Sequence, residues 1–393
     1  MREVSTVCHR PIASPTLSHK NDGVPATLHT TLQVIQRGID QRLHIGAQLY
    51  VSLRGRIIAD IAVGEARGGV AMATDTLMPW LSAGKPLAAA AIAQLWERGR
   101  FELDDPVARH IPEFAASGKE SVTIRHLLTH TGGFRNAAVN WTPESWEQII
   151  ARINAAPLEP SWVPGRKAGY HAASSWYVLG ELVRRLDGRT FDRYVRDEIL
   201  LPAGMDDSWV GMPAEKYAEY GQRIGIMHSA MSGHLRPQRW DVEQYAAVCR
   251  PAANARGPIR ELGRFYEMLL ARGRCPQTGR RIISSQSVEA MTARHRAGMY
   301  DHTLRRVVDW GLGFVLNAPG YDKEAAYSFG PHASCRTFGH GGSRSSMGLA
   351  DPEHALAVAF VFNGMPGEAM HAQRNAAMAA AIYQDLGLAS AER

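Results

Sequence analysis

The spacing of apolar residues predicts a helix and a hairpin at the start of the chain. Residues 28–43 repeat apolar positions at helical intervals, as expected for a helix with one buried face. The stretch IGAQLYVSLRGRIIADIAVG, residues 45–64, holds two strand-like runs separated by Arg54 and Gly55. We therefore predict a helix followed by a β-hairpin that turns at Arg54 and Gly55.

The next apolar stretch has helical spacing and leads into a mainly helical middle. In WLSAGKPLAAAAIAQLWERG, residues 80–99, Leu87, Ala91 and Leu95 recur every four positions. Gly99 offers a C-terminal stop for this helix. Further helical segments are predicted within residues 103–114, 122–134, 174–188 and 191–205.

Strand-like runs return late in the chain. They occupy residues 310–316, 335–342 and 354–364, and a helix is predicted over residues 368–386. Strands at both ends with helices between them imply that the two ends form one sheet. We predict an α/β (α+β) fold with a central antiparallel sheet that is flanked by helices, built from both chain ends, and interrupted by an inserted, mainly helical domain.

The predicted domain boundaries follow from this pattern. They are a flexible N-terminal tail over residues 1–27, a sheet domain from residues 28–100 and 285–388, and the inserted helical domain over residues 101–284. A cleft is expected where the inserted domain meets the sheet.

The composition is that of an ordinary globular protein and argues against two kinds of partner. The chain has 393 residues, 45% hydrophobic and 21% charged, which is enough for a sizeable core. The formal net charge of +6 comes from scattered basic residues, so we expect no nucleic-acid partner. No stretch approaches the ~18 consecutive apolar residues of a membrane-spanning helix, so we expect no membrane partner.

The N-terminal residues and the cysteines bear on the cellular compartment. Residues 1–27 contain no apolar run that could form the core of a signal peptide. The cysteines lie far apart, without the spacing of a zinc site or a disulfide framework. These features predict a cytoplasmic protein with free thiols. The four cysteines are Cys8, Cys249, Cys275 and Cys335.

Ser82 and Lys85 stand three residues apart at the start of the helix predicted over residues 80–99. At this spacing the two side chains project from one helix face and can touch. A serine hydroxyl becomes a nucleophile when a base takes its proton, and Lys85 could do this if burial kept it neutral. The alternative is an N-capping serine beside a solvated lysine.

Two further stretches carry residues suited to catalysis. Tyr170 lies in a turn bounded by Pro and Gly, just ahead of a predicted helix, where its phenol can reach a neighbouring site. His340, Gly341 and Gly342 end a predicted strand. Paired glycines at such a position let a substrate lie close against the backbone.

The order and spacing of these three stretches resemble the serine β-lactamase-like superfamily. Within it, the chain looks most like the class C β-lactamases and the family eight carboxylesterases and transacylases. The resemblance covers about residues 28–386 and includes the connecting phrases GRFELDDPVARHIPEF, TIRHLLTHTGGF, LPAGMDDS and HGGSRSSMGLADPE. It implies a serine hydrolase or acyltransferase that acts on an ester or thioester through an acyl-serine intermediate.

The resemblance also implies a role for each matching residue. Ser82 matches the nucleophile, Lys85 the general base and Tyr170 the proton-shuttling tyrosine. The family holds the oxyanion with two backbone N–H groups, which match those of Ser82 and Ser343. The third motif, which lines the substrate site, falls on His340, Gly341 and Gly342.

Two positions depart from the pattern of β-lactamases. Ala172 replaces the asparagine that binds the substrate amide, and His340 replaces the lysine that helps to hold the substrate carboxylate. Because an ordinary histidine is mostly neutral at pH 7, both changes favour a neutral ester or thioester as acyl donor. Arg344 could supply the lost positive charge, but an arginine after a strand is more often solvated.

Three functions remain open from the sequence. The first is an esterase or biosynthetic transacylase that takes a small-molecule acyl donor and passes the acyl group to water, an alcohol or an amine. The second is a β-lactamase or D-amino-acid peptidase, and the third is a catalytically silent binding protein. The sequence leaves the oligomeric state open.

We expect neither a cofactor nor a metal. His126 and His130 have the i, i+4 spacing of a zinc-binding helix, but the glutamate of HExxH is missing and no third ligand is evident. A structural role for the two histidines is therefore the preferred interpretation.

Overall fold

A computed structural model of the protein describes residues 28–137, 139, 144–231, 234–320 and 329–389. The tail predicted over residues 1–27 lies outside these ranges. The helices are α1 (His29–Asp40), α2 (Lys85–Glu97), α3 (Ile124–Leu128), α4 (Trp146–Ala155), α5 (Ser174–Asp187), α6 (Phe191–Val195), α7 (Ala214–Tyr220), α8 (Glu243–Ala246), α9 (Ile259–Leu270), α10 (Ser285–Thr292) and α11 (Glu368–Asp385). Shorter helical turns are η1 (Leu81–Gly84), η2 (Val107–Arg109), η3 (Pro112–Gly118), η4 (Arg196–Leu200) and η5 (Gly221–Arg223).

The main sheet has eight strands in the order β11-β12-β13-β14-β15-β1-β2-β3, and neighbouring strands run antiparallel. Its strands are β1 (Gly46–Leu53), β2 (Arg56–Arg67), β3 (Val70–Ala71), β11 (Asp309–Trp310), β12 (Val315–Leu316), β13 (Phe338–Gly342), β14 (Ser346–Asp351) and β15 (Leu356–Phe362). Because β1 pairs with β15, for example Tyr50 opposite Ala359, the two ends of the chain form one sheet, as predicted.

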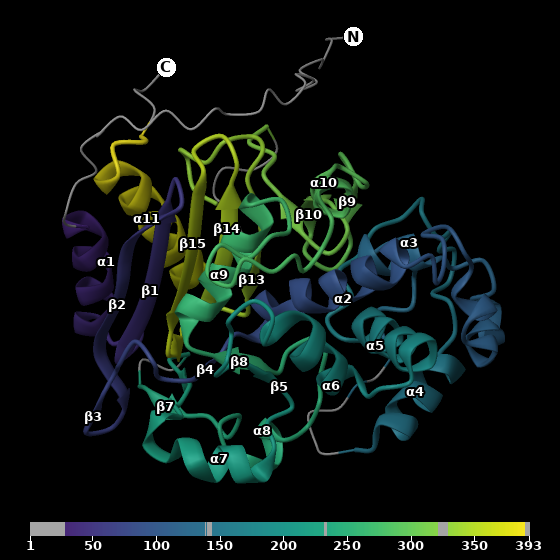
Figure 1. Ribbon diagram of the computed structural model, residues 1–393, viewed down its shortest axis with the longest axis horizontal. Coiled ribbons are helices and arrows are strands. Elements are labelled where there is room, and N and C mark those ends of the chain that lie inside the picture. The colour runs from purple at the N-terminus through teal and green to yellow at the C-terminus, as the bar shows by residue number, and fades with distance from the viewer. Residues whose placement is uncertain (1–27, 138, 140–143, 232–233, 321–328, 390–393) are drawn as a thin grey trace.

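Helices cover both faces of this sheet. Leu49 and Val51 of β1 pack in one core cluster with residues of α1 and α11, whereas Tyr50 packs in the other cluster with residues of α9. A Cβ at Gly263 of α9 would lie 2.2 Å from the Tyr50 ring, so only glycine fits there. Figure 1 shows α1 and α11 along one side of the sheet and α9 on the other. Every residue of β1 is consequently buried.

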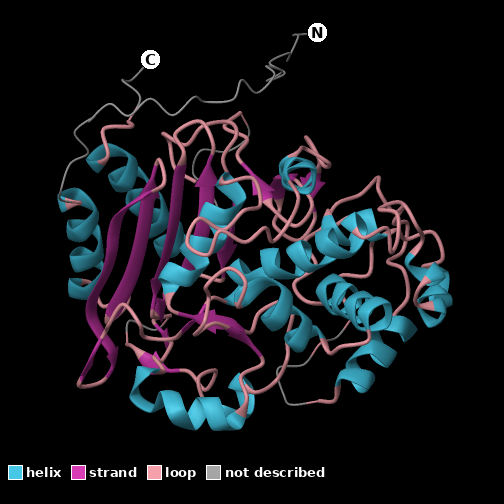
Figure 2. Ribbon diagram, viewed as in Figure 1, coloured by secondary structure: helices cyan, strands magenta, loops and turns pink. Residues whose placement is uncertain are grey.

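A layer of helices packs beside the sheet, with α2 at its centre (Figure 2). All residues of α2 from Lys85 to Leu95 are buried, and α5, α6 and α10 contact this helix. The turn between β11 and β12 also packs closely on α2, since a Cβ at Gly313 would lie 2.5 Å from Cβ of Ala89. The fold class predicted from the sequence is confirmed, while the domain boundaries at residues 101 and 284 stay a prediction.

Several short strands differ from the sequence prediction. Residues 310–316 form two strands rather than one, because Gly313 has a φ of +84° and the chain turns back there. The pattern did not predict β14, whose residues are all buried. Small sheets also form outside the main sheet. They are formed by β4 (Met78–Pro79), β5 (Trp209–Val210) and β8 (Ala255–Gly257), by β6 (His228–Ser229), β7 (Arg236–Pro237) and β16 (Gly364–Met365), and by β9 (Tyr300–Asp301) and β10 (Arg306–Val307).

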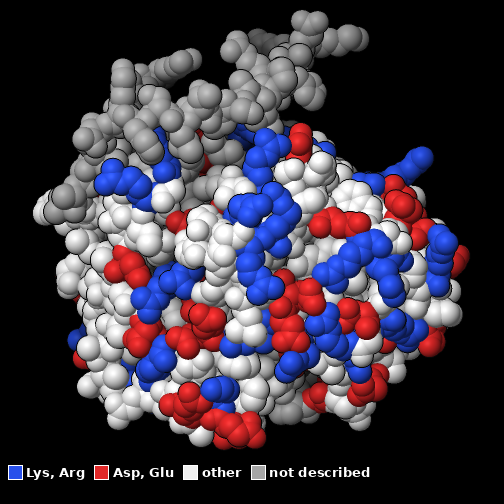
Figure 3. All heavy atoms as spheres, viewed as in Figure 1, with Lys and Arg blue, Asp and Glu red and all other residues white. Residues whose placement is uncertain are grey.

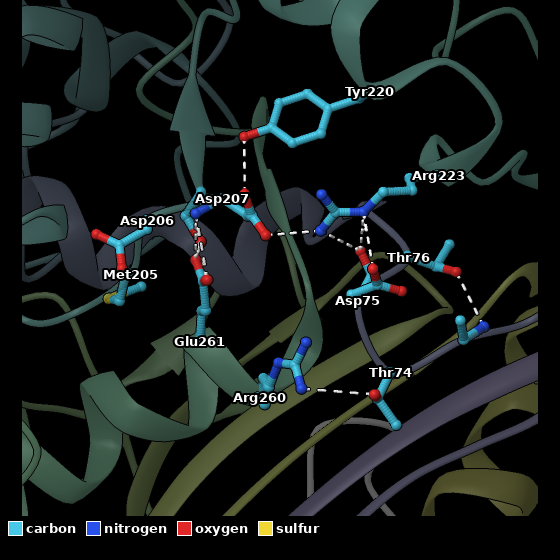
Figure 4. Close-up of polar contacts among 12 residues, drawn as sticks. Thr74, Asp75, Thr76, Met205, Asp206, Asp207, Tyr220, Arg223, Arg260 and Glu261 are labelled. Atoms are coloured by element: carbon cyan, nitrogen blue, oxygen red, sulfur yellow. Dashed lines mark hydrogen bonds and ion pairs between the residues drawn. The ribbon is translucent and has the colours of Figure 1, made fainter.

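A polar network fixes the loop that leads into β4 (Figure 4). Arg223 forms ion pairs with Asp75 of this loop, at 3.0 Å, and with Asp207, at 2.6 Å. Asp207 also accepts a hydrogen bond from the Tyr220 hydroxyl at 3.0 Å, and its backbone N–H donates to the Glu261 carboxylate of α9 at 3.2 Å. The network therefore ties the loop before β4 to η5, and η5 through Asp207 to α7 and α9.

The surface carries charges of both signs. On the face shown in Figure 3, Lys and Arg side chains are interspersed with Asp and Glu side chains. Within the part of the chain that the structure describes, no helix is long and apolar enough to cross a lipid bilayer.

Candidate active site

Ser82 lies in η1, a single 3₁₀ turn between β4 and α2. The residue before it, Leu81, has a φ of +53°, a left-handed conformation that costs a non-glycine residue about 1–3 kcal/mol. Trp80 holds the turn in place, because its backbone N–H donates to the carbonyl of Ala255 at 2.8 Å and its indole N–H donates to that of Gly257 at 3.0 Å. The side chain of Ser82 is only half-buried, so a substrate can reach it.

Lys85 is the first residue of α2 and is 0% exposed. Its Nζ lies 2.9 Å from Oγ of Ser82 and donates a hydrogen bond to the carbonyl of Ala252 at 2.6 Å. No carboxylate among the described residues forms an ion pair with it, and burial lowers the pKa of Lys85 well below the ordinary lysine value of 10.5. A neutral amine at this place has a lone pair that can accept the proton of Ser82.

Tyr170 lies beside this pair, with its ring centroid 5.3 Å from Nζ of Lys85. The position of Tyr170 is fixed through its backbone N–H, which donates to Oδ1 of Asp301 at 3.0 Å. Asp301 is fully buried and forms an ion pair with Arg296 at 2.8 Å. The same carboxylate oxygen accepts two more backbone N–H groups from its own turn, both at 2.9 Å. A buried ion pair thus holds the segment that carries Tyr170.

Replacing Asp301 by alanine is expected to lower the free energy of unfolding by about 3–5 kcal/mol, because Arg296 would remain as a buried cation without its carboxylate. Denaturant unfolding followed by circular dichroism measures this loss. Glu219→Ala is the matched control, since Glu219 pairs with Lys216 at an exposed site and its loss should cost less than about 1 kcal/mol. An equally small cost at Asp301 would show that the buried pair does not hold this segment.

The strand β13 brings His340, Gly341 and Gly342 to the same place, with the His340 ring centroid 6.1 Å from that of Tyr170. The carbonyl of Gly341 can only accept, so Nδ1 of His340 donates to it, at 2.8 Å. Burial is the main cause that lowers the pKa of His340 to about 3. The imidazole is therefore neutral, and its buried Nε2 is left as an acceptor with no partner among the described residues.

Gly342 packs against the turn that holds Ser82. A Cβ at Gly342 would lie 2.2 Å from the carbonyl oxygen of Trp80 and 3.3 Å from Cβ of Leu81, so no other residue fits without a shift of the backbone. Ser343 follows directly. The structure therefore brings the segment that contains Ser343 beside η1. The role of the Ser343 N–H as the second oxyanion donor, which the family resemblance implies, stays a prediction.

The expectation that the Arg344 side chain is solvated is wrong. Its side chain is 22% exposed, donates through Nη1 to the carbonyl of Pro366 at 3.3 Å, and has Nε 3.6 Å from a carboxylate oxygen of Glu368. The side chain is thus engaged at the start of α11. Ala172, which departs from the family pattern together with His340, is exposed.

Two histidines that the sequence analysis did not assign to the site lie near Tyr170: His130 packs against its ring, and His171 is the next residue in the chain and packs against His130. The ring of His130 lies 4.7 Å from that of Tyr170 and 4.4 Å from that of Trp310, centroid to centroid. Its Nδ1 accepts the backbone N–H of His171 at 3.0 Å. Burial lowers the pKa of both imidazoles, that of His171 to about 3, so both are neutral. Nothing in the local sequence could have placed His130 here.

The structure separates the histidine pair that has zinc-site spacing. The helix α3 ends at Leu128, so His126 and His130 do not share a helix. Nδ1 of His126 accepts the backbone N–H of Thr123 at 3.2 Å, as part of the cap that begins α3. His126 therefore has a structural role, whereas His130 contacts the site.

The family model described as Beta-lactamase matches residues 32–383 of the chain. Esterase EstB of Burkholderia gladioli is 29% identical over 388 residues, which cover 88% of this chain and 94% of that protein. Among solved structures, a penicillin-binding protein homologue from Caulobacter crescentus superposes with a TM-score of 0.76 at 29% identity, covering 93% of this chain and 99% of the homologue. A family VIII carboxylesterase superposes with a TM-score of 0.75 at 26% identity, with the same coverage of both chains.

Proposed function

This chain belongs to the Beta-lactamase family, and on that basis we propose that it is a serine esterase or acyltransferase that takes the acyl group of an ester or thioester onto Ser82. The observation that carries the proposal is the buried amine of Lys85, which has no carboxylate partner among the described residues and lies 2.9 Å from Oγ of Ser82. A solvated lysine beside a capping serine would be charged and could not take a proton.

The proposed cycle begins with attack of Ser82 Oγ on the carbonyl carbon of the donor. Lys85, together with the phenol of Tyr170, takes the proton of the hydroxyl as the new O–C bond forms. The backbone N–H groups of Ser82 and Ser343 stabilise the oxyanion, each contributing about 2.7–4 kcal/mol at the transition state. The bond to the leaving alcohol then breaks, and Tyr170 gives that oxygen the proton.

The second half of the cycle removes the acyl group from Ser82. The same amine and phenol take a proton from the acceptor as its oxygen or nitrogen bonds to the acyl carbon. They return a proton to Oγ of Ser82 as the bond between Oγ and the acyl carbon breaks, which regenerates the hydroxyl. With water as acceptor the protein is an esterase. With an alcohol or amine held in a site that excludes water, it is an acyltransferase.

A neutral donor is favoured over a β-lactam. His340 is neutral and cannot hold a substrate carboxylate by charge, and Ala172 has no side-chain amide to bind a substrate amide. Arg344 is engaged at Pro366 and Glu368, which further weakens the case for an anionic substrate. The name of the relative EstB, an esterase, supports the same choice.

The proposal includes a cytoplasmic place of action. It is supported by the three cysteines in the described part of the chain, Cys249, Cys275 and Cys335, no two of which form a disulfide with each other. Cys8 lies outside the described residues.

The test compares acyl donors on the purified full chain. Hydrolysis of p-nitrophenyl butyrate is expected with a larger kcat/KM than that of nitrocefin or a D-alanyl peptide. A larger kcat/KM for nitrocefin or the peptide would favour the alternative β-lactamase or peptidase. Failure to turn over any of the three, with no mass added to the protein, would favour a binding protein.

Ala172→Asn is expected to raise kcat/KM for nitrocefin by about tenfold, the value of roughly one additional hydrogen bond. Because Ala172 is exposed, the substitution should leave packing unchanged. The kcat/KM for p-nitrophenyl butyrate is the internal control and should stay within twofold. No gain with nitrocefin would mean that the missing amide is not what limits the use of lactams.

A further inference from the structure

Arg374 lies on α11, outside the candidate active site, and is 5% exposed. No carboxylate among the described residues forms an ion pair with it. Its Nη groups contact neutral acceptors, and its guanidinium lies 4.1 Å from the ring centroid of Phe362. A buried cation without a counter-ion is costly unless its N–H groups are bound. Its contacts therefore indicate what it does.

The guanidinium of Arg374 joins three segments of the chain. Nη2 donates to the carbonyl of Arg344 at 2.9 Å and to that of Gly364 at 3.1 Å. Nη1 lies 3.0 Å from Nδ1 of His44 and donates to the carbonyl of Leu43 at 3.4 Å. The planar fork of donors thus clamps the turn after β13 to the start of β16 and to the residues that precede β1.

The turn held by this clamp contains the proposed oxyanion donor. Its residues run from Gly342 to Ser345, whose N–H donates to the carbonyl of Gly342 at 3.1 Å. Ser343 is the second residue of the turn. The third, Arg344, has a φ of +50°, a left-handed conformation that a non-glycine residue keeps only when its surroundings hold it. The carbonyl of this strained residue is the one that Arg374 binds at 2.9 Å.

We propose that Arg374 is a positioning residue that keeps the turn after β13 in the conformation in which the N–H of Ser343 meets the oxyanion. The inference rests on the proposed function. Arg374 acts through the turn and touches no reacting atom, so it is not a catalytic residue. The side chain of Arg344 adds a second tie to the start of α11, through Pro366 and Glu368.

The expected signature is selective for the transition state. A loosened turn would misplace a donor that binds the oxyanion more strongly than the ground-state carbonyl. Loss of Arg374 should therefore lower kcat with little change in KM. A residue that only stabilises the fold would instead lower the fraction of active protein, and leave kcat unchanged in the molecules that remain active.

The experiment measures Arg374→Gln and Arg374→Lys against the wild type, with p-nitrophenyl butyrate as substrate. Active sites are counted by titration with a fluorophosphonate, so kcat refers to functional molecules alone. We expect kcat of Arg374→Gln to fall by about tenfold or more, a part of the 10²- to 10³-fold effect of losing one oxyanion donor, with KM within twofold. The inhibition constant of a boronic acid, which forms a tetrahedral adduct on serine, should rise by the same factor.

Arg37→Gln is the matched control. Arg37 is an exposed arginine of α1 that lines the same surface hollow as Arg374, and its replacement should change neither kcat nor the inhibition constant. Arg374→Lys keeps a cation with fewer donors, so an intermediate loss is expected. If Arg374→Gln does not fold, the kcat of Arg374→Lys still tests whether Arg374 positions the turn.

Two results would overturn the inference and are distinct from failure of the proposed function. If the wild type hydrolyses the ester and kcat per titrated site of the variants stays within twofold, Arg374 does not position the turn. A lower kcat/KM that comes only from a higher KM, with the inhibition constant of the boronic acid unchanged, would also show that Arg374 does not position the turn. If the wild type neither hydrolyses the ester nor reacts with the fluorophosphonate, the proposed function itself fails.

Discussion

Replacing Ser82 by alanine is expected to lower kcat/KM for p-nitrophenyl butyrate by at least about 1,000-fold. In the proposed cycle, Oγ of Ser82 is the atom that forms a bond to the acyl group, so no neighbouring side chain can take over its role. The fold should survive, because Ser82 is only half-buried. Steady-state rates of the wild type and the variant, at equal concentrations of folded protein, measure the effect.

Ser285→Ala is a matched control for this substitution. Ser285 is a half-buried serine in α10, and its loss should leave kcat/KM within twofold. If Ser82→Ala retained a tenth or more of the wild-type rate, the hydroxyl would not be the nucleophile and the proposed cycle would be wrong.

The second large effect is expected at Lys85, where Lys85→Met should lower kcat by at least about 1,000-fold while leaving the protein as stable or more stable. Activity falls because the base is lost, and stability holds because methionine fills a buried site without the cost of burying an amine. Rates and denaturant unfolding on the same sample separate the two outcomes. An active variant, or a strongly destabilised one, would contradict the role given to the buried amine.

The pH profile of the wild type tests the charge of Lys85 without a mutation. The competent form is the neutral amine, which is the form present above its pKa, so kcat/KM should rise with pH and then level off. Because burial lowers this pKa well below 10.5, the plateau should be reached well before the pH at which an exposed lysine titrates. A rate that still rises with unit slope at pH 10 would mean that Lys85 has an ordinary pKa.

The local pattern of apolar, polar and turn-forming residues was sufficient to predict much of the fold. The hairpin of β1 and β2 turns at Arg54 and Gly55, both with positive φ, as expected where two alternating runs meet at a glycine. The helix predicted over residues 368–386 is α11, Glu368–Asp385. The proximity of Ser82 and Lys85 also followed from spacing, although a 3₁₀ turn, and not the first turn of α2, provides it.

The groups that hold Lys85 and Tyr170 in place could not be predicted from local pattern, because they lie on segments that are distant in the sequence. The carbonyl that binds Lys85 belongs to Ala252, 167 residues away, and a backbone carbonyl leaves no mark in the sequence. The carboxylate of Asp301 holds Tyr170 across 131 residues. His130 was visible only as half of a histidine pair with zinc-site spacing, and its actual neighbours come from other parts of the chain.

The most direct test of the account is mass spectrometry of the wild-type protein quenched in acid within milliseconds of mixing with p-nitrophenyl butyrate. The account predicts a butyryl group on the proteolytic peptide that contains Ser82, formed at a rate no slower than turnover and absent from the Ser82→Ala variant. Turnover with no modified peptide, or a butyryl group on a different residue that forms and decays at the rate of turnover, would contradict it.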